Sequence, residues 1–194
     1  MARETPHPKQ GATTYFVRTD GGVASQCNGL ADAPYPGKGG GHACAWSSPM
    51  IALPAPPYGQ SAVPLIKGGD TLLIKSGSYM IGYGAPGASS CNTGATYACT
   101  MAPVPSGPSA SQPTRILGAD CSAPPQLWGT ERAASVLSLA GSSNVEVGCL
   151  EITDHSSCIE NHCQMSGTCS GEIDRCERDS YPYGSWAENG LTAS

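Results

Sequence analysis

The sequence has few charged side chains and very little positive charge. Charged residues make up 13% of the 194 residues, only ten residues are Lys or Arg, and the formal net charge is −5. Proteins that bind nucleic acids need clustered Lys and Arg to contact phosphates, and helices that lie on membrane surfaces need them on their polar face. We therefore expect neither a nucleic acid nor a membrane as a partner.

Long apolar runs are also missing. No stretch approaches the roughly 18 consecutive apolar residues of a membrane-spanning helix, and the first eight residues, MARETPHP, lack the apolar segment of a secretory signal peptide. We expect a mature domain expressed without its leader. Residues 1–12 are predicted to be disordered or vector-derived, and residues 13–194 to form a single domain.

What the chain has in abundance is Gly, Pro and Cys. The 25 Gly and 17 Pro interrupt helices and favour turns, while a hydrophobic content of 39% is too high for a disordered tail. An even number of Cys in Gly- and Ser-rich loops is typical of disulfides in an oxidising compartment, so we expect a secreted or periplasmic protein. A metal-binding cytosolic protein is the competing interpretation.

The predicted disulfide cysteines are Cys27, Cys44, Cys91, Cys99, Cys121, Cys149, Cys158, Cys163, Cys169 and Cys176. The loop containing Cys27 and Cys44 is predicted to be closed by a bridge between them, and Cys91 with Cys99 is a second local pair.

Short alternating runs predict β-strands. Residues 13–17, two runs within 69–81, and residues 113–120 and 135–139 are β-like, and Val145, Val147, Leu150 and Ile152 alternate with polar residues. The pair Gly148–Cys149 shifts the phase of this alternation, as a chain does when it turns a corner. The pattern repeats at 158–162 and again at 190–194, and it indicates stacked short strands without helical periodicity.

Two of these segments resemble a known superfamily. SNVEVGCLEIT (143–153) and GDTLLIKSGSY (69–79) are similar to strand-and-corner motifs of pectin-lyase-like right-handed parallel β-helix proteins. The resemblance implies an all-β solenoid of few coils with long disulfide-closed loops, truncated at its C-terminal end. It implies no particular activity, because the superfamily includes lyases, hydrolases and adhesins. The open C-terminal end predicts self-association or a further chain that covers it.

A dense group of ionisable residues supplies the candidate catalytic site: Asp154, His155, Glu160, Asp174 and Arg175. Paired carboxylates suit glycoside hydrolysis, whereas a lyase uses a basic residue and a cation that neutralises a uronate. No cofactor is predicted, except calcium in the case of a lyase. Two alternatives stay open: the acidic residues hydrogen-bond the backbone at a corner, or the His and Cys residues between 155 and 176 bind zinc.

Aromatic residues supply the candidate substrate-binding site. Tyr181, Tyr183 and Trp186 lie in one loop, and flat rings in such a position stack on sugars. A second aromatic group, Tyr79 and Tyr83, lies in SYMIGYG. The alternative is that the rings pack loops onto the body of the protein.

Together these observations predict an extracellular protein that interacts with a polysaccharide, either as a lyase or glycoside hydrolase or as a fragment of one. The alternative is a non-catalytic surface, structural or self-assembling module. Whether the chain is an enzyme is not decided by the sequence.

Overall fold

The computed structural model describes residues 12–56, 61, 63–88, 99–130, 133–153, 187 and 189–193. Short strands dominate this part of the chain, together with one four-residue helix, α1 (Pro49–Ala52). The strands are β1 (Thr14–Gly22), β2 (Thr71–Ile74), β3 (Ser78–Ile81), β4 (Thr114–Gly118), β5 (Gln126–Gly129), β6 (Ser135–Ser138), β7 (Val145–Gly148), β8 (Glu151–Thr153) and β9 (Asn189–Thr192). No helix among the described residues has the length and apolarity that crossing a membrane requires.

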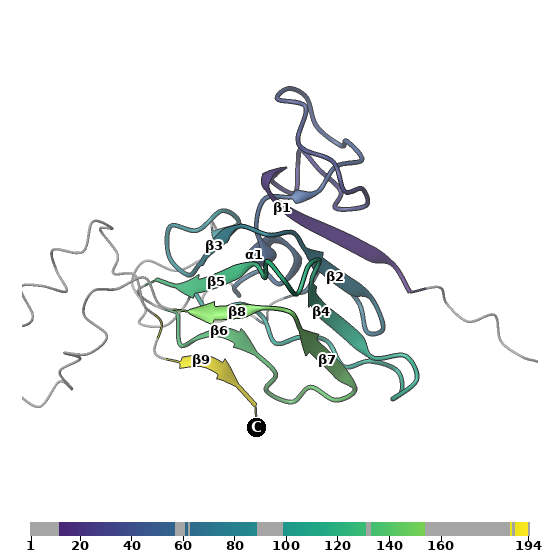
Figure 1. The fold of residues 1–194 in the computed structure, drawn as a ribbon, viewed down its shortest axis with the longest axis vertical. Helices are drawn as coiled ribbons and strands as arrows, with labels where there is room; N and C mark the ends of the chain where they lie inside the picture. Colours follow the sequence, from purple (N-terminus) through teal and green to yellow (C-terminus); the bar gives the residue numbers. More distant parts are fainter. Residues whose placement is uncertain are drawn as a thin grey trace, which may run out of the picture.

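The strands form three parallel sheets, ordered β1-β2-β4-β7, β3-β5-β8 and β6-β9. Apart from β1 and β2, which the long segment 23–70 connects, neighbours within a sheet are not consecutive strands, because a parallel partner can only be reached through a crossover connection. Three connections are short and link the first two sheets: β2 to β3, β4 to β5, and β7 to β8. As a result, the strand order in the three-stranded sheet follows that of the four-stranded sheet (Figure 1).

The core lies between the inward faces of the sheets. Registered neighbours such as Leu72 and Ile116 are almost fully buried, as are Leu127 and Leu137 on the other two sheets. Their strand neighbours alternate outward, which gives β2, β3 and β5 the burial pattern expected for sheets with one buried face. Parallel, in-register stacking therefore places side chains of similar character above one another.

One buried carboxylate secures the start of this stack. Asp70 is 6% exposed and accepts hydrogen bonds from the backbone N–H of Thr13 at 2.9 Å and of Lys67 at 2.7 Å. Thr114, also buried, accepts one from the Gly69 N–H at 2.9 Å. Because buried polar groups are costly unless they are hydrogen-bonded, these contacts explain why Asp and Thr stand at the entrance to β2 and β4.

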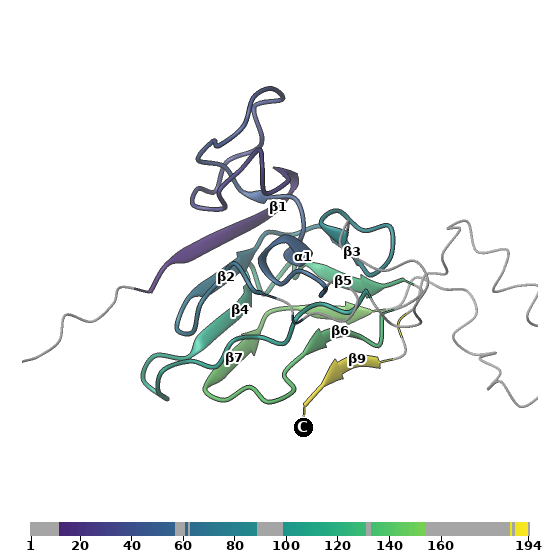
Figure 2. The same cartoon turned by 180° about the vertical axis from the view of Figure 1, so that it is seen from behind.

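A long loop, residues 23–47, projects away from the sheets beyond β1 (Figure 1 and Figure 2). The disulfide Cys27–Cys44 closes it, which is the pairing that the sequence predicts. Trp46 at its end is 3% exposed, stacks on Tyr15 with ring centroids 5.0 Å apart, and donates from Nε1 to the Cys27 carbonyl at 2.9 Å. The helix α1 follows and is buried along its whole length.

The structure corrects the predicted fold class. Instead of the predicted right-handed parallel β-helix of few coils, the described residues form several short parallel sheets of unequal size, with four, three and two strands. Period-two alternation and Gly-rich corners predict buried strands and turns, which is why the described strands other than β5 fall within or overlap the predicted runs; the predicted run at 158–162 lies outside the described residues. They do not determine how many strands join one sheet, and the connections between strands range from two residues (149–150) to the long segment between β1 and β2. The mainly β character remains.

Candidate functional site

The residues predicted to form the active and sugar-binding sites lie outside the described part of the chain. This applies to the five candidate catalytic residues and to the three loop aromatics: Asp154, His155, Glu160, Asp174, Arg175, Tyr181, Tyr183 and Trp186. Cys91, Cys158, Cys163, Cys169 and Cys176 also lie outside it. Within the described residues, no group of three or more His, Cys, Asp or Glu side chains is placed to hold a metal ion. A site is therefore sought on the sheets themselves.

The outer face of the sheet β3-β5-β8, here called the β5 face, carries two rows of side chains. Parallel register aligns Ser78, Gln126 and Glu151 in a polar row, and Met80, Trp128 and Thr153 in a second row. The residues between them, such as Leu127, point into the core. The β5 face is therefore amphipathic, with a polar edge beside an apolar one.

Trp128 lies at the middle of the apolar row and is held in one orientation. Its indole Nε1 donates to the Ser78 Oγ at 2.9 Å, so the ring reaches across from β5 to β3. The side chain is only partly buried. Because the ring is fixed and part of its surface is accessible, it offers a flat apolar platform to a ligand. The strand that carries it, β5, has a neighbouring strand on both sides.

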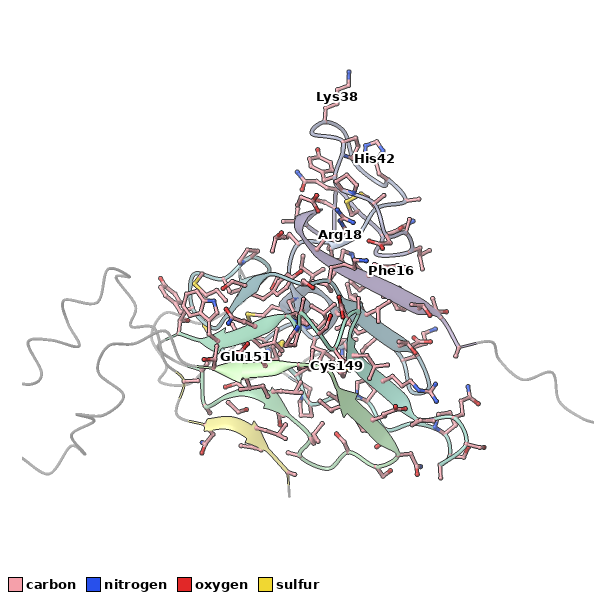
Figure 3. The ribbon with its side chains drawn as sticks, in the orientation of Figure 1. Phe16, Arg18, Lys38, His42, Cys149 and Glu151 are labelled. Atoms are coloured by element: carbon pink, nitrogen blue, oxygen red, sulfur yellow. A yellow bond between two sulfur atoms is a disulfide. The ribbon has the colours of Figure 1, made fainter. Side chains whose placement is uncertain are left out.

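The polar row is also fixed across strands. The Gln126 side-chain Nε2 donates to a Glu151 carboxylate oxygen at 3.1 Å, and Glu151 is exposed. Figure 3 shows Glu151 on β8, next to the corner that Cys149 forms. The amide and the carboxylate together offer further donors and acceptors to a ligand at the edge of the indole.

The corner beside the polar row is cross-linked. A disulfide joins Cys121, between β4 and β5, to Cys149, between β7 and β8. Cys149 adopts a φ of 55°, a left-handed conformation that is uncommon for residues other than Gly. Asp120 lies next to Cys121, and hydrogen bonds from Ser122 hold the pKa of this carboxyl below its usual range. The corner therefore orders the starts of β5 and β8.

Tyr79, from the second aromatic group considered in the sequence, takes part in packing. It is 3% exposed, donates from its hydroxyl to the Lys75 carbonyl at 2.8 Å, and has a pKa that burial raises to about 12. The interpretation of this ring as a packing residue is thus correct, and its interpretation as an exposed stacking surface is wrong. Alternation explains the difference, because Tyr79 follows the outward-facing Ser78.

A second polar cluster lies at the base of the 23–47 loop. The Arg18 guanidinium contacts Asp20 at 2.7 Å and Asp32 at 2.9 Å, and the Lys75 ammonium contacts Asp32 at 3.0 Å. The hydrogen bonds from Arg18 lower the pKa of both carboxyls. Each charge in this cluster has an opposite partner, which indicates a clamp between the loop and the strands β1 and β2. In Figure 3, Arg18 lies on β1 while Lys38 stands at the tip of the loop.

Sequence reasoning missed the β5 face. It treated the residues between the predicted runs 113–120 and 135–139 as a polar stretch, although Leu127 and Trp128 follow the two prolines and carry the required alternation of one inward and one outward side chain. A scan of protein-family models, a search of curated proteins and a search of solved structures each found no match to this chain. The pectin-lyase-like resemblance therefore stays a prediction.

Proposed function

We propose that this is a secreted protein that binds a polysaccharide through the β5 face. The observation that carries the proposal is the partly exposed Trp128, whose indole is fixed by Ser78 beside the partly buried Gln126 and the exposed Glu151. Disulfides support a location in an oxidising compartment, since they persist there and are rare in the cytosol.

The chemistry of the two rows matches the chemistry of a sugar. Pyranose rings have an apolar face of C–H groups and a rim of hydroxyls, so one surface of the sugar can cover the indole while its rim meets the polar row. Covering the ring removes apolar area from water, at about 25 cal/mol per Å². Because Trp128 and Glu151 are already held by Ser78 and Gln126, little side-chain freedom is lost on binding.

Binding fits this face better than hydrolysis does. Glycoside hydrolases use two carboxyl groups on either side of the scissile bond, whereas the strands β3, β5 and β8 contribute one carboxylate, Glu151. The proposal that the protein cleaves a polysaccharide depends on the acidic and basic residues between 154 and 175. It would be tested by product release from the same polysaccharides.

The proposal is tested with Trp128→Ala and a matched control, Phe16→Ala. Phe16 is also partly buried and points outward, but from β1 in the four-stranded sheet. A panel of linear glucan, mannan, xylan and galactan is measured by affinity electrophoresis and by calorimetry. Wild type and Phe16→Ala should bind the same polysaccharide, and Trp128→Ala should bind it about tenfold more weakly, a loss of about 1.4 kcal/mol.

Thermal unfolding of both variants shows whether each remains folded. If no polysaccharide binds wild type, or if folded Trp128→Ala binds as tightly as wild type, the β5 face is not the binding site.

A second candidate, a self-associating module, is favoured by a different observation. Each of the three sheets ends at β7, β8 or β9 on the side opposite the 23–47 loop (Figure 1). In β9, Leu191 is registered with the buried Leu137, yet its own exposure is 49%. Sheet edges of this kind can pair with another chain. Mass in solution should then rise with concentration, and a monodisperse monomer would exclude this candidate.

A further inference from the structure

Among the described residues, the three strands of the β5 face carry charge of one sign only. Its three strands, SYMI, QLWG and EIT, contain no Lys or Arg and contribute one acid, Glu151. At the adjoining corner, Asp120 adds a second exposed carboxylate whose pKa is lowered, so it is ionised at neutral pH.

Two described basic residues, Lys75 and Arg115, lie on the strands and turns that lead into this face, and each contacts a carboxylate outside it, although the Lys75 charge also helps to lower the pKa of Asp120. The Lys75 ammonium contacts Asp32 at 3.0 Å at the base of the loop, and the Arg115 guanidinium on the outer face of β4 contacts Glu146 at 2.7 Å. A ligand carboxylate or sulfate on the indole would thus approach Glu151 with no cation on the three described strands to balance it.

The cost of that approach can be estimated from Coulomb's law. Two like unit charges about 4 Å apart in a water-like dielectric repel each other enough to weaken binding about fivefold, and more where the sugar excludes water. Salt reduces this repulsion only in part at such a short distance, because the Debye length is about 8 Å at physiological ionic strength. A hydroxyl at the same place would instead donate a hydrogen bond to the carboxylate.

We propose that the β5 face selects neutral polysaccharides over uronate-containing or sulfated ones, with Glu151 as the residue that sets this selectivity. The inference rests on the proposed function, because it concerns the ligand class of the same face. It assigns Trp128 to affinity and Glu151 to discrimination between ligands.

The experiment compares each neutral polysaccharide of the panel with the same polymer after carboxymethylation, which adds acid groups to an unchanged backbone. Wild type should bind the neutral polymer at least about fivefold more tightly than the carboxymethylated one. In Glu151→Gln, which keeps the size of the side chain and removes its charge, this ratio should fall toward one. In Glu151→Lys it should reverse, with a preference for the acidic polymer that weakens as salt is added.

Glu146→Gln is the matched control, since Glu146 is an exposed acid on the outer face of a different sheet, and it should leave the ratio as in wild type. Binding that depends on Trp128 but favours the carboxymethylated polymers would overturn the selectivity and leave the proposed function standing. A ratio of neutral to carboxymethylated binding that Glu151→Gln leaves unchanged would have the same two consequences. If no polymer of either kind binds, both the proposed function and this inference are wrong.

Discussion

The replacement of Gly118 by Ala tests the register of β4 against β7, next to the corner that leads into the β5 face. Gly118 is buried at the end of β4, and a Cβ added there would overlap the backbone carbonyl oxygen of Cys149 and lie 2.7 Å from the Pro125 Cδ. Neither neighbour is the end of a flexible side chain, so the corner must shift to make room. Overpacking of a well-packed site destabilises a protein by about 1–3 kcal/mol. Because the added Cβ would clash with backbone, we expect Gly118→Ala to lower the free energy of unfolding by about 3 kcal/mol.

Gly148→Ala is the matched comparison. Gly148 is at the end of β7, and a Cβ there would lie 3.5 Å from the Leu117 Cδ2, an ordinary contact. The free energy of unfolding of Gly148→Ala should therefore differ from that of wild type by no more than about 0.5 kcal/mol. For a domain of this size, 3 kcal/mol corresponds to a decrease in Tm of about 6–12 °C.

Urea denaturation of both oxidised variants measures the difference in the free energy of unfolding. Because the clash displaces the corner that precedes Glu151, Gly118→Ala should also lose part of its polysaccharide binding, whereas Gly148→Ala should not. Equal stability of the two variants would refute the close approach of β4 to the Cys149 carbonyl, and with it the register of β4 against β7.

Two further predictions concern the loop and the buried tyrosine. Replacing both Cys27 and Cys44 by Ser should lower the free energy of unfolding by about 3 kcal/mol, because the bridge closes a loop with a sequence separation of 17; an unchanged urea midpoint would contradict this. Burial raises the pKa of Tyr79 from 10.0 to about 12. The contribution of its neutral hydroxyl to the free energy of unfolding is therefore complete below pH 10, and it should fall by about 2–3 kcal/mol as the pH rises from about 10 to 12. Tyr79→Phe should remove this part of the alkaline destabilisation, and an identical pH dependence of the urea midpoint in both proteins would contradict the assignment.

Local features of the fold could be predicted because their signals lie within a few residues. The two strands on either side of Ser76–Gly77 follow from alternation and a turn, and both are observed as β2 and β3. Gly148–Cys149 was expected to form a corner, and Cys149 has the positive φ that turns the chain there. The bridge between Cys27 and Cys44 closes a short Gly-rich loop, so few alternative pairings compete with it.

Features that depend on distant partners could not be predicted in the same way. The alternation in β5 covers only four residues, and these become a strand because β3 and β8 hydrogen-bond to both sides of them, which the local sequence does not show. The bridge between Cys121 and Cys149 spans a sequence separation of 28, among ten cysteines that allow a very large number of pairings. The number of strands in each sheet is likewise a tertiary property, which is why the predicted right-handed parallel β-helix was wrong.

The same dependence on distant partners explains why Trp128 is suited to bind a ligand. A tryptophan alone in a loop would lose rotational freedom when a sugar covers it, and that loss opposes binding. On β5, the indole and the backbone are already ordered in the folded protein, because Ser78 holds the indole and the neighbouring strands hold the backbone. Gln126 does the same for Glu151 from one strand away. The contacts that link β3, β5 and β8 into one sheet therefore also fix the side chains of the proposed site. It follows that variants of Ser78 or Gln126 should weaken binding in part through the mobility they restore to Trp128 and Glu151.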